Sequence, residues 1–157
     1  MLSQLDATYL QQLIVYNKVI QQRNSFLKSC AQTQTRNNAL LDVLDEQLIT
    51  AGNTIHTQRK NFLPEFNEQV IRFYQTIAGK AEPVSVNYES QLLQQSFELL
   101  LSQNRERDYL LQRTSIGIHK DDLLFELNGE PFKQTASQGQ RKSLLFSLKL
   151  AEAEELK

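Results

Sequence analysis

A short polar run near the carboxyl end of this sequence has the clearest chemical potential. Ser137, Gln138, Gly139, Gln140 and Arg141 come just before an apolar, helix-forming tail. The start of a helix gathers free backbone N–H groups and the positive end of the helix dipole, and a glycine there leaves room for a ligand. The segment can therefore bind a phosphate group. By itself, however, a serine in this place is more commonly only the N-cap of the helix.

A second group of residues, His119, Asp121 and Asp122, has the side chains of a divalent-metal site. The alternative is that the aspartates cap turns and that their loop braces the last helix. No second histidine or acidic cluster is evident that would complete a ligand shell. We therefore favour the structural interpretation and expect no metal here.

Basic side chains outnumber acidic ones in the first 36 residues, where Lys18, Arg23, Lys28 and Arg36 stand against Asp6 alone. The net charge of the whole chain is −1, which argues against nucleic-acid binding by an overall field. The four cations are instead candidates for local contacts with DNA phosphates. A solvated helix face would explain them equally well.

The single cysteine, Cys30, excludes an internal disulfide and fits a reducing compartment. Its place on an apolar stripe predicts a buried thiol. The sequence has no apolar run of about 18 residues and no basic-then-apolar leader pattern. We therefore expect a cytoplasmic protein that does not contact a membrane.

Two long helices are predicted in the first half of the chain. In the first, from residue 5 to about 30, apolar positions recur at spacings of three, four and seven: Leu13, Tyr16, Ile20, Leu27 and Cys30. Arg23 falls on this seam, where it must extend along the partner helix or pair with an acid across it.

A polar linker at 31–37, in which Asn37 or Asn38 can cap the next helix, leads to a second apolar stripe that runs from Leu41 to Ile77. Two such helices predict an antiparallel, coiled-coil-like hairpin arm over residues 1–80. Pro64 predicts a kink or a break near residues 61–63.

Residues 81–157 predict a small α+β lobe. Strands are expected at 84–88, 114–118 and 123–127, and a helix at 91–112 that Asn104 divides. Asn128-Gly129 is a strong hairpin turn into residues 130–133, and a final helix covers 138–156. The predicted fold class is α+β, mainly α, with a long antiparallel helical hairpin attached to a lobe of antiparallel strands and helices.

Several blocks of the sequence, in order along the chain, resemble the RecF family of ABC/SMC-like DNA-repair ATPases. These blocks are residues 16–24, residues 41–56, Arg105-Glu106-Arg107-Asp108, residues 117–123 and residues 136–152. Two positions depart from the pattern: Ile118 stands where the family commonly has proline, and Gln138 where other ABC-type signatures carry glycine. The first change is conservative in an extended loop, and the second leaves less room beside a phosphate.

The sequence has no Gly-x-x-x-x-Gly-Lys-Ser/Thr phosphate loop, since Ala78-Gly79-Lys80 lacks the first glycine and a following hydroxyl residue. It also has no Walker B strand after the last helix. The resemblance therefore implies an internal fragment, with the helical lid and signature region of its parent. Alone, such a fragment is expected to hold no cofactor and to be inactive.

What the resemblance implies for the parent is an ATPase that acts in DNA repair, recombination, replication and the SOS response. ATP with Mg²⁺ would lie between two protomers as they form a homodimer. Residues 137–141 would close on the γ-phosphate of the partner's nucleotide, with the Ser137 hydroxyl and the Gly139 N–H as donors and Gln140 orienting the loop. The implied partners are DNA at single-strand gaps or junctions and the proteins RecR and RecO.

Two other functions fit parts of the sequence. A structural coiled-coil module without nucleotide chemistry would explain the helical hairpin but leaves the tail from residue 81 onward without a role. A small metal-dependent hydrolase around His119 would instead require tight binding of a divalent metal.

Overall fold

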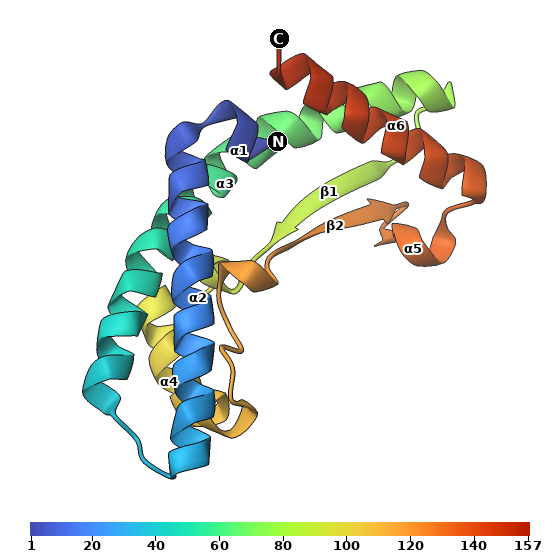
Figure 1. Cartoon of the computed structure of the whole chain (residues 1–157). Helices are drawn as coiled ribbons and strands as arrows, with labels where there is room; N and C mark the ends of the chain where they lie inside the picture. The colour runs from blue at the N-terminus through green and yellow to red at the C-terminus, as the bar shows by residue number, and fades with distance from the viewer. The chain divides into compact units, whose positions relative to one another are not determined.

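A computed structural model describes residues 1–157. It contains six α-helices, two short 3-10 helices and one three-stranded antiparallel sheet (Figure 1). This is the predicted fold class, α+β and mainly α. The chain forms two compact units: a helical unit of residues 6–58 and 90–121, and a sheet unit of residues 1–5, 59–89 and 122–157.

The compact units do not divide the chain at residue 80, where we predicted a boundary between arm and lobe. Helix α3 (Asn38–Ala78) contributes its first half to the helical unit and its second half to the sheet unit. The predicted boundary follows the end of the helical run at Gly79 and Pro83, whereas the compact units divide α3 itself, because one continuous helix can supply apolar residues to two separate cores.

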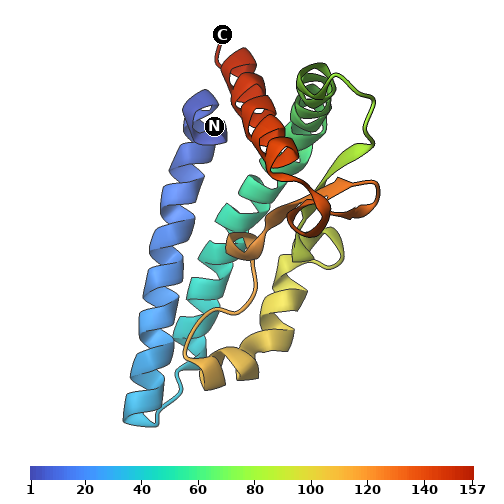
Figure 2. The ribbon, with the colours of Figure 1, turned by 90° about the vertical axis from the view of Figure 1, so that its right-hand side faces the viewer.

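The helical unit is built on α2 (Ala7–Thr33), the first half of α3 and α4 (Phe97–Leu111). Helices α2 and α3 run antiparallel and are joined by the polar linker, as Figure 2 shows. The predicted helical hairpin is present in this form. A short helix, α1 (Leu2–Leu5), precedes α2 and belongs to the sheet unit.

Side-chain caps fix where both hairpin helices begin. The Oδ1 atom of Asp6 accepts hydrogen bonds from the backbone N–H groups of Thr8 and Tyr9, at 2.7 and 3.1 Å. The Oδ1 atom of Asn37 accepts one from the N–H of Leu40 at 3.1 Å. Of the two candidate caps of α3, it is therefore Asn37 that acts.

In the middle of the helical unit, the backbone of α3 lies close to aromatic side chains of the neighbouring helices. Gly52 on α3 faces the rings of Phe97 and Tyr16, and a Cβ atom at this position would overlap Phe97. Nearer the hairpin turn, a second cluster joins the three helices, with four buried members: Leu27, Cys30, Leu41 and Tyr109. The predicted burial of the Cys30 thiol is confirmed.

Pro64 does not break the second helix. Helix α3 continues from Asn38 to Ala78 with Pro64 inside it, which excludes the break, one of the two predicted outcomes. A proline removes only one N–H donor from the helix. Here Phe62 and Leu63 before it and Phe66 after it pack into the sheet unit's core, which favours the continuous helix.

The sheet unit is organised around two paired strands. β1 (Val84–Glu89) and β2 (Asp122–Leu127) are antiparallel, with Val84 opposite Leu127. Their core is shared with α3 and the last helix through nine buried side chains: Phe66, Val70, Tyr74, Val84, Leu127, Phe132, Ala136, Leu144 and Ala151.

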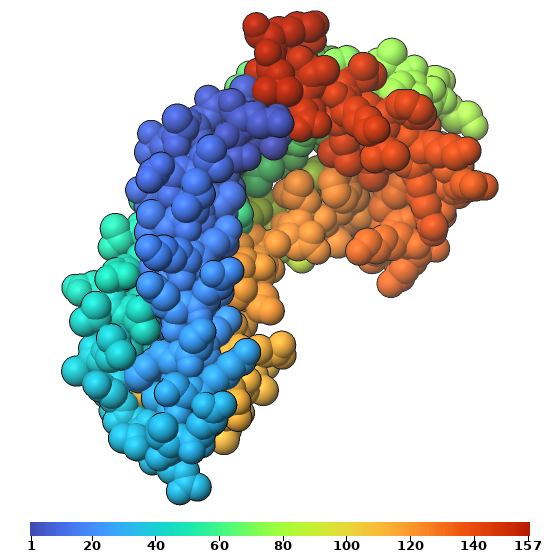
Figure 3. Space-filling model, viewed as in Figure 1, coloured from blue at the N-terminus to red at the C-terminus, as the bar shows by residue number.

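A tight turn follows β2 as predicted. Asn128 and Gly129 have φ values of 55° and 79°, the left-handed pair that a two-residue hairpin requires. The returning strand β3 (Glu130–Pro131) is short, because α5 (Phe132–Thr135) begins at once. Helix α6 (Gln138–Glu155) then lies at the surface of this unit (Figure 3).

Two other local predictions were wrong. The region 91–112 is divided before α4, where Ser96 is the N-cap, and not at Asn104. Residues 114–118 form no strand; they lead into a 3-10 turn at Ile118–Lys120. Thr114 and Ser115 direct their hydrogen bonds to side chains of the helical unit instead of a strand partner.

Candidate functional site at the start of the last helix

A capping box begins α6. The Ser137 hydroxyl oxygen accepts a hydrogen bond from the Gln140 N–H at 3.2 Å, and the Gln140 Oε1 atom accepts one from the Ser137 N–H at 2.8 Å. This reciprocal pair satisfies two backbone donors that a helix start would otherwise leave unpaired. The sequence Ser-x-x-Gln therefore sets the position and the conformation of this helix start.

Neighbouring groups hold the capping box from two sides. The Arg141 guanidinium donates from Nη2 to the Lys133 carbonyl at 2.8 Å, which connects α6 to α5. The Nε2 atom of Gln140 lies 3.3 and 3.4 Å from the two carboxylate oxygens of Glu82. Ala136, just before the cap, is buried in the core of the sheet unit.

The outer side of this helix start is open. Ser137, Gln138, Gly139 and Arg141 are exposed, and the nearest atom to a Cβ built on Gly139 is the Ser137 hydroxyl at 3.9 Å. A serine hydroxyl that accepts from the helix still has its own proton to donate outward. The arrangement can therefore offer an oxyanion the Ser137 O–H and the positive end of an 18-residue helix.

The loop that carries His119 belongs to a different constellation, in the helical unit. The Nδ1 atom of His119 lies 2.9 Å from the Tyr16 hydroxyl, and the Nε2 atom of the same ring lies 3.3 Å from the Thr114 carbonyl. A carbonyl only accepts, so Nε2 carries the proton and Nδ1 accepts from Tyr16. Partial burial lowers the pKa of His119.

No group of three or more His, Cys, Asp or Glu side chains is arranged to hold a metal ion. His119 uses both ring nitrogens for hydrogen bonds within the helical unit. The hydrolase hypothesis, which needs these nitrogens for a metal, has no geometric support.

The four candidate DNA-binding cations differ in their surroundings. Lys18 and Lys28 are exposed on α2. Arg36 is half exposed, pairs with Glu106 at 2.9 Å and lies over the ring of Tyr109.

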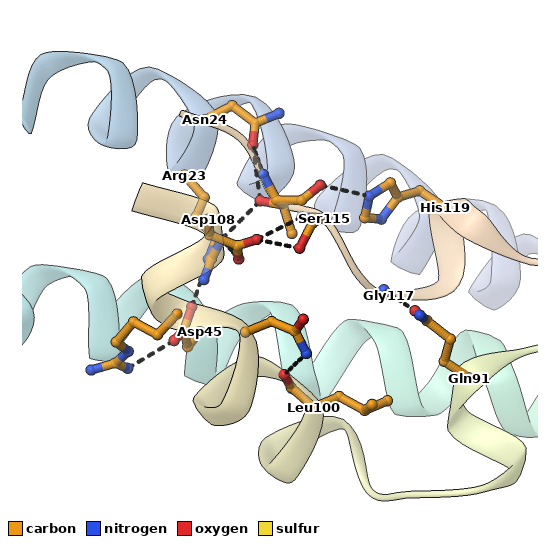
Figure 4. Close-up of polar contacts among 12 residues, drawn as sticks. Arg23, Asn24, Asp45, Gln91, Leu100, Asp108, Ser115, Gly117 and His119 are labelled. Atoms are coloured by element: carbon orange, nitrogen blue, oxygen red, sulfur yellow. Dashed lines mark hydrogen bonds and ion pairs between the residues drawn. The ribbon is translucent and has the colours of Figure 1, made fainter. Parts of the chain in front are cut away.

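Arg23 is fully buried and cannot reach DNA, which corrects its inclusion among the candidates. Its guanidinium donates from Nε to Asp45 and from Nη1 to Asp108, both at 2.7 Å (Figure 4). Nη1 also donates to the Thr114 hydroxyl at 3.0 Å. The sequence had offered this alternative, since a cation on an apolar seam needs an acid across it.

Sequence reasoning missed three residues that the structure makes central: Asp45, Asp108 and Glu82. The two aspartates had a detectable signal, because each falls on the apolar face of its own helix: Asp45 comes four residues after Leu41, and Asp108 seven residues after Leu101. Glu82 had none, because it is one acid in an irregular stretch between helix and strand.

Comparison with known proteins shows which proteins this chain is similar to. No protein-family model matches the chain. The DNA replication and repair protein RecF of Flavobacterium johnsoniae is 48% identical over 156 residues, and that of Parabacteroides distasonis is 42% identical over 151 residues. These alignments cover 99% and 96% of this chain but only 44% and 40% of the relatives.

Solved structures agree in fold. Two structures of the recombination mediator protein RecF in the RecFOR pathway, RecF-ATP and RecF-ATPrS, match with TM-scores of 0.87 and 0.85. Both are 27% identical to this chain; they cover 97% and 96% of it, and the match covers 43% and 42% of theirs.

Sequence and fold therefore match this chain to one region of DNA replication and repair proteins. The predicted resemblance to RecF is confirmed, and the chain corresponds to a region that spans 40 to 44% of the two relatives' length. Separately, none of its helices is both long and apolar enough to cross a membrane.

Proposed function

We propose that this chain is the signature-bearing part of a RecF-type repair ATPase, and that the start of α6 closes on the γ-phosphate of ATP held by a partner protomer. The observation that carries the proposal is the exposed helix start with Ser137 as its N-cap and Gly139 two residues later. The match to a structure of RecF-ATP supports the choice of nucleotide.

Each side chain then has a physical role. The Ser137 hydroxyl and the Gly139 N–H donate to γ-phosphate oxygens, and the dipole of α6 adds positive potential. Gln140 keeps Ser137 in place through the capping box. Arg141 donates one hydrogen bond to the Lys133 carbonyl, and the remaining N–H groups of its guanidinium can face the phosphate.

The other contacts of the nucleotide, including Mg²⁺, are assigned to a phosphate loop that this sequence does not contain. The same proposal includes an ATP-dependent homodimer in the cytoplasm that acts with RecR and RecO at single-strand gaps in DNA. Lys18 and Lys28, exposed on α2, are the proposed contacts of the helical arm with DNA phosphates.

The test uses the complete protein that carries this region and compares Ser137→Asp with Ser137→Asn. Both residues are good N-caps, so α6 keeps its start, but aspartate places a negative charge beside the γ-phosphate. We expect ATP-driven dimerisation, followed by light scattering, to be lost in Ser137→Asp and largely kept in Ser137→Asn, with similar melting temperatures. If Ser137→Asp dimerised with ATP like the wild type, the proposal would be wrong.

A further inference from the structure

The Glu82 carboxylate joins two parts of the sheet unit that are far apart in sequence. One oxygen accepts a hydrogen bond from the Tyr74 hydroxyl on α3 at 2.7 Å. The same carboxylate faces the Nε2 atom of Gln140 on α6, at 3.3 and 3.4 Å from its two oxygens. The side chain thus lies between a helix core position and the capping box of the candidate phosphate site.

The Tyr74 end of this connection is firmly held. Tyr74 is fully buried, and its ring packs edge-on against Phe132 at 6.1 Å between centroids. Burial and the hydrogen bond to Glu82 raise the pKa of the Tyr74 hydroxyl far above its usual range. Tyr74 therefore remains a protonated donor at every physiological pH and fixes one end of the carboxylate.

The Gln140 end is where the carboxylate has a consequence. A glutamine amide has an accepting end and a donating end, and it can turn either one toward the Ser137 N–H. A carboxylate can only accept, so Glu82 attracts the donating end, Nε2, and repels Oε1. That preference leaves Oε1 facing Ser137, which is the orientation that the capping box needs.

We infer that Glu82, anchored by Tyr74, is a positioning residue for the signature: it selects the orientation of the Gln140 amide and so holds Ser137 in the conformation that meets the γ-phosphate. This inference rests on the proposed function of the helix start. It adds a contact from the segment between α3 and β1, outside the signature itself.

The main test uses Glu82→Gln in the complete protein, because this substitution keeps the size of the side chain and removes only the obligate acceptor. We expect the ATP concentration for half-maximal dimerisation to rise about threefold to fivefold, as the loss of one modest hydrogen bond would predict. Amide hydrogen exchange at Ser137 should speed up by a similar factor, since its acceptor is no longer fixed. Tyr74→Phe should shift both measurements in the same direction.

Asn67→Ala is the matched control for a purely structural effect. The Asn67 Nδ2 atom donates to the Val86 carbonyl at 3.2 Å, so this variant removes a hydrogen bond between α3 and β1 that does not reach the capping box. It should lower the melting temperature and leave Ser137 exchange and ATP dependence unchanged.

The outcomes separate the inference from the function on which it rests. If Glu82→Gln behaves like the wild type in exchange and dimerisation while Ser137→Asp fails to dimerise, Glu82 has no positioning role and the proposed function stands. The inference is equally overturned if Asn67→Ala shifts both measurements as much as Glu82→Gln does. If Ser137→Asp dimerises normally, the proposed function and this inference both fall.

Discussion

The Nη1 atom of Arg23 lies 2.7 Å from the Oδ2 atom of Asp108, and both side chains are completely excluded from solvent. The Nε atom of the same guanidinium lies 2.7 Å from Asp45, whose other oxygen accepts from Arg105 at 2.9 Å. One cation from α2 thus meets one acid from α3 and one from α4. This network aligns the three helices of the helical unit, because the charged side chain of each helix must lie within hydrogen-bond distance of the others.

Arg23→Met should destabilise the helical unit by about 3–5 kcal/mol, because it leaves Asp108 buried without a cation and Asp45 with Arg105 alone. Denaturant unfolding of the full-length protein measures the change. Arg36→Met is the control: its ion pair with Glu106 is exposed, with side-chain exposures of 50% and 73%, and should be worth no more than about 1 kcal/mol. Equal effects of the two substitutions would contradict the structural role of Arg23.

Gly52→Ala should destabilise the protein by about 1–3 kcal/mol, because the added methyl group overlaps the ring of Phe97 and must displace it. Gly139→Ala is the matched substitution at an open helix position, where the nearest atom to a new Cβ is 3.9 Å away. It should be neutral or slightly stabilising. Thermal melting of both variants measures the difference in stability. A Gly52→Ala variant as stable as the wild type would show that α3 and Phe97 are not in close contact.

His119 should make folding stability depend on pH in a definite direction. Partial burial lowers its pKa in the folded protein, so below the unfolded value of about 6.5 the unfolded state binds more protons. Its stabilising contribution is therefore present above about pH 6.5 and is lost as pH falls through the folded-state pKa. Unfolding free energies measured from pH 7.5 downward should show this decline in the wild type and a smaller one in His119→Gln. The same series in His56→Gln should retain the His119 contribution; a wild-type profile in His119→Gln would disprove it.

Lys18→Gln combined with Lys28→Gln tests the proposed DNA contacts of the helical arm. Each phosphate contact contributes about 0.9 to the slope of log affinity against log salt concentration, so losing both should reduce the slope by about 2. Fluorescence anisotropy with gapped DNA over a range of salt concentrations gives this slope. Glutamine keeps helix propensity close to that of lysine, so a changed slope reports charge. An unchanged slope would remove α2 from the DNA-binding surface.

Local spacing was enough to predict much of the architecture. The alternation at 84–88, the Asn128-Gly129 turn and the Ser-x-x-Gln start of α6 each encode their structure within a few residues, and each is found at or within a residue of the predicted place. Residues 114–118 show the limit. Their pattern suits a strand, but Thr114 and Ser115 find polar partners on α2 and α4 that a local pattern cannot reveal.

The sequence alone determined the helical hairpin, the small antiparallel sheet, the capped helix start and the resemblance to RecF. Tertiary structure alone decided that Arg23 is an internal cation and not a DNA ligand, that His119 uses both nitrogens for hydrogen bonds, and that Glu82 reaches the capping box. The physical reason is the separation along the chain between the residues that interact. Helix periods, turns and caps arise from neighbours within about four residues, whereas the acidic partners of Arg23 and of Gln140 lie between 22 and 85 residues away along the chain.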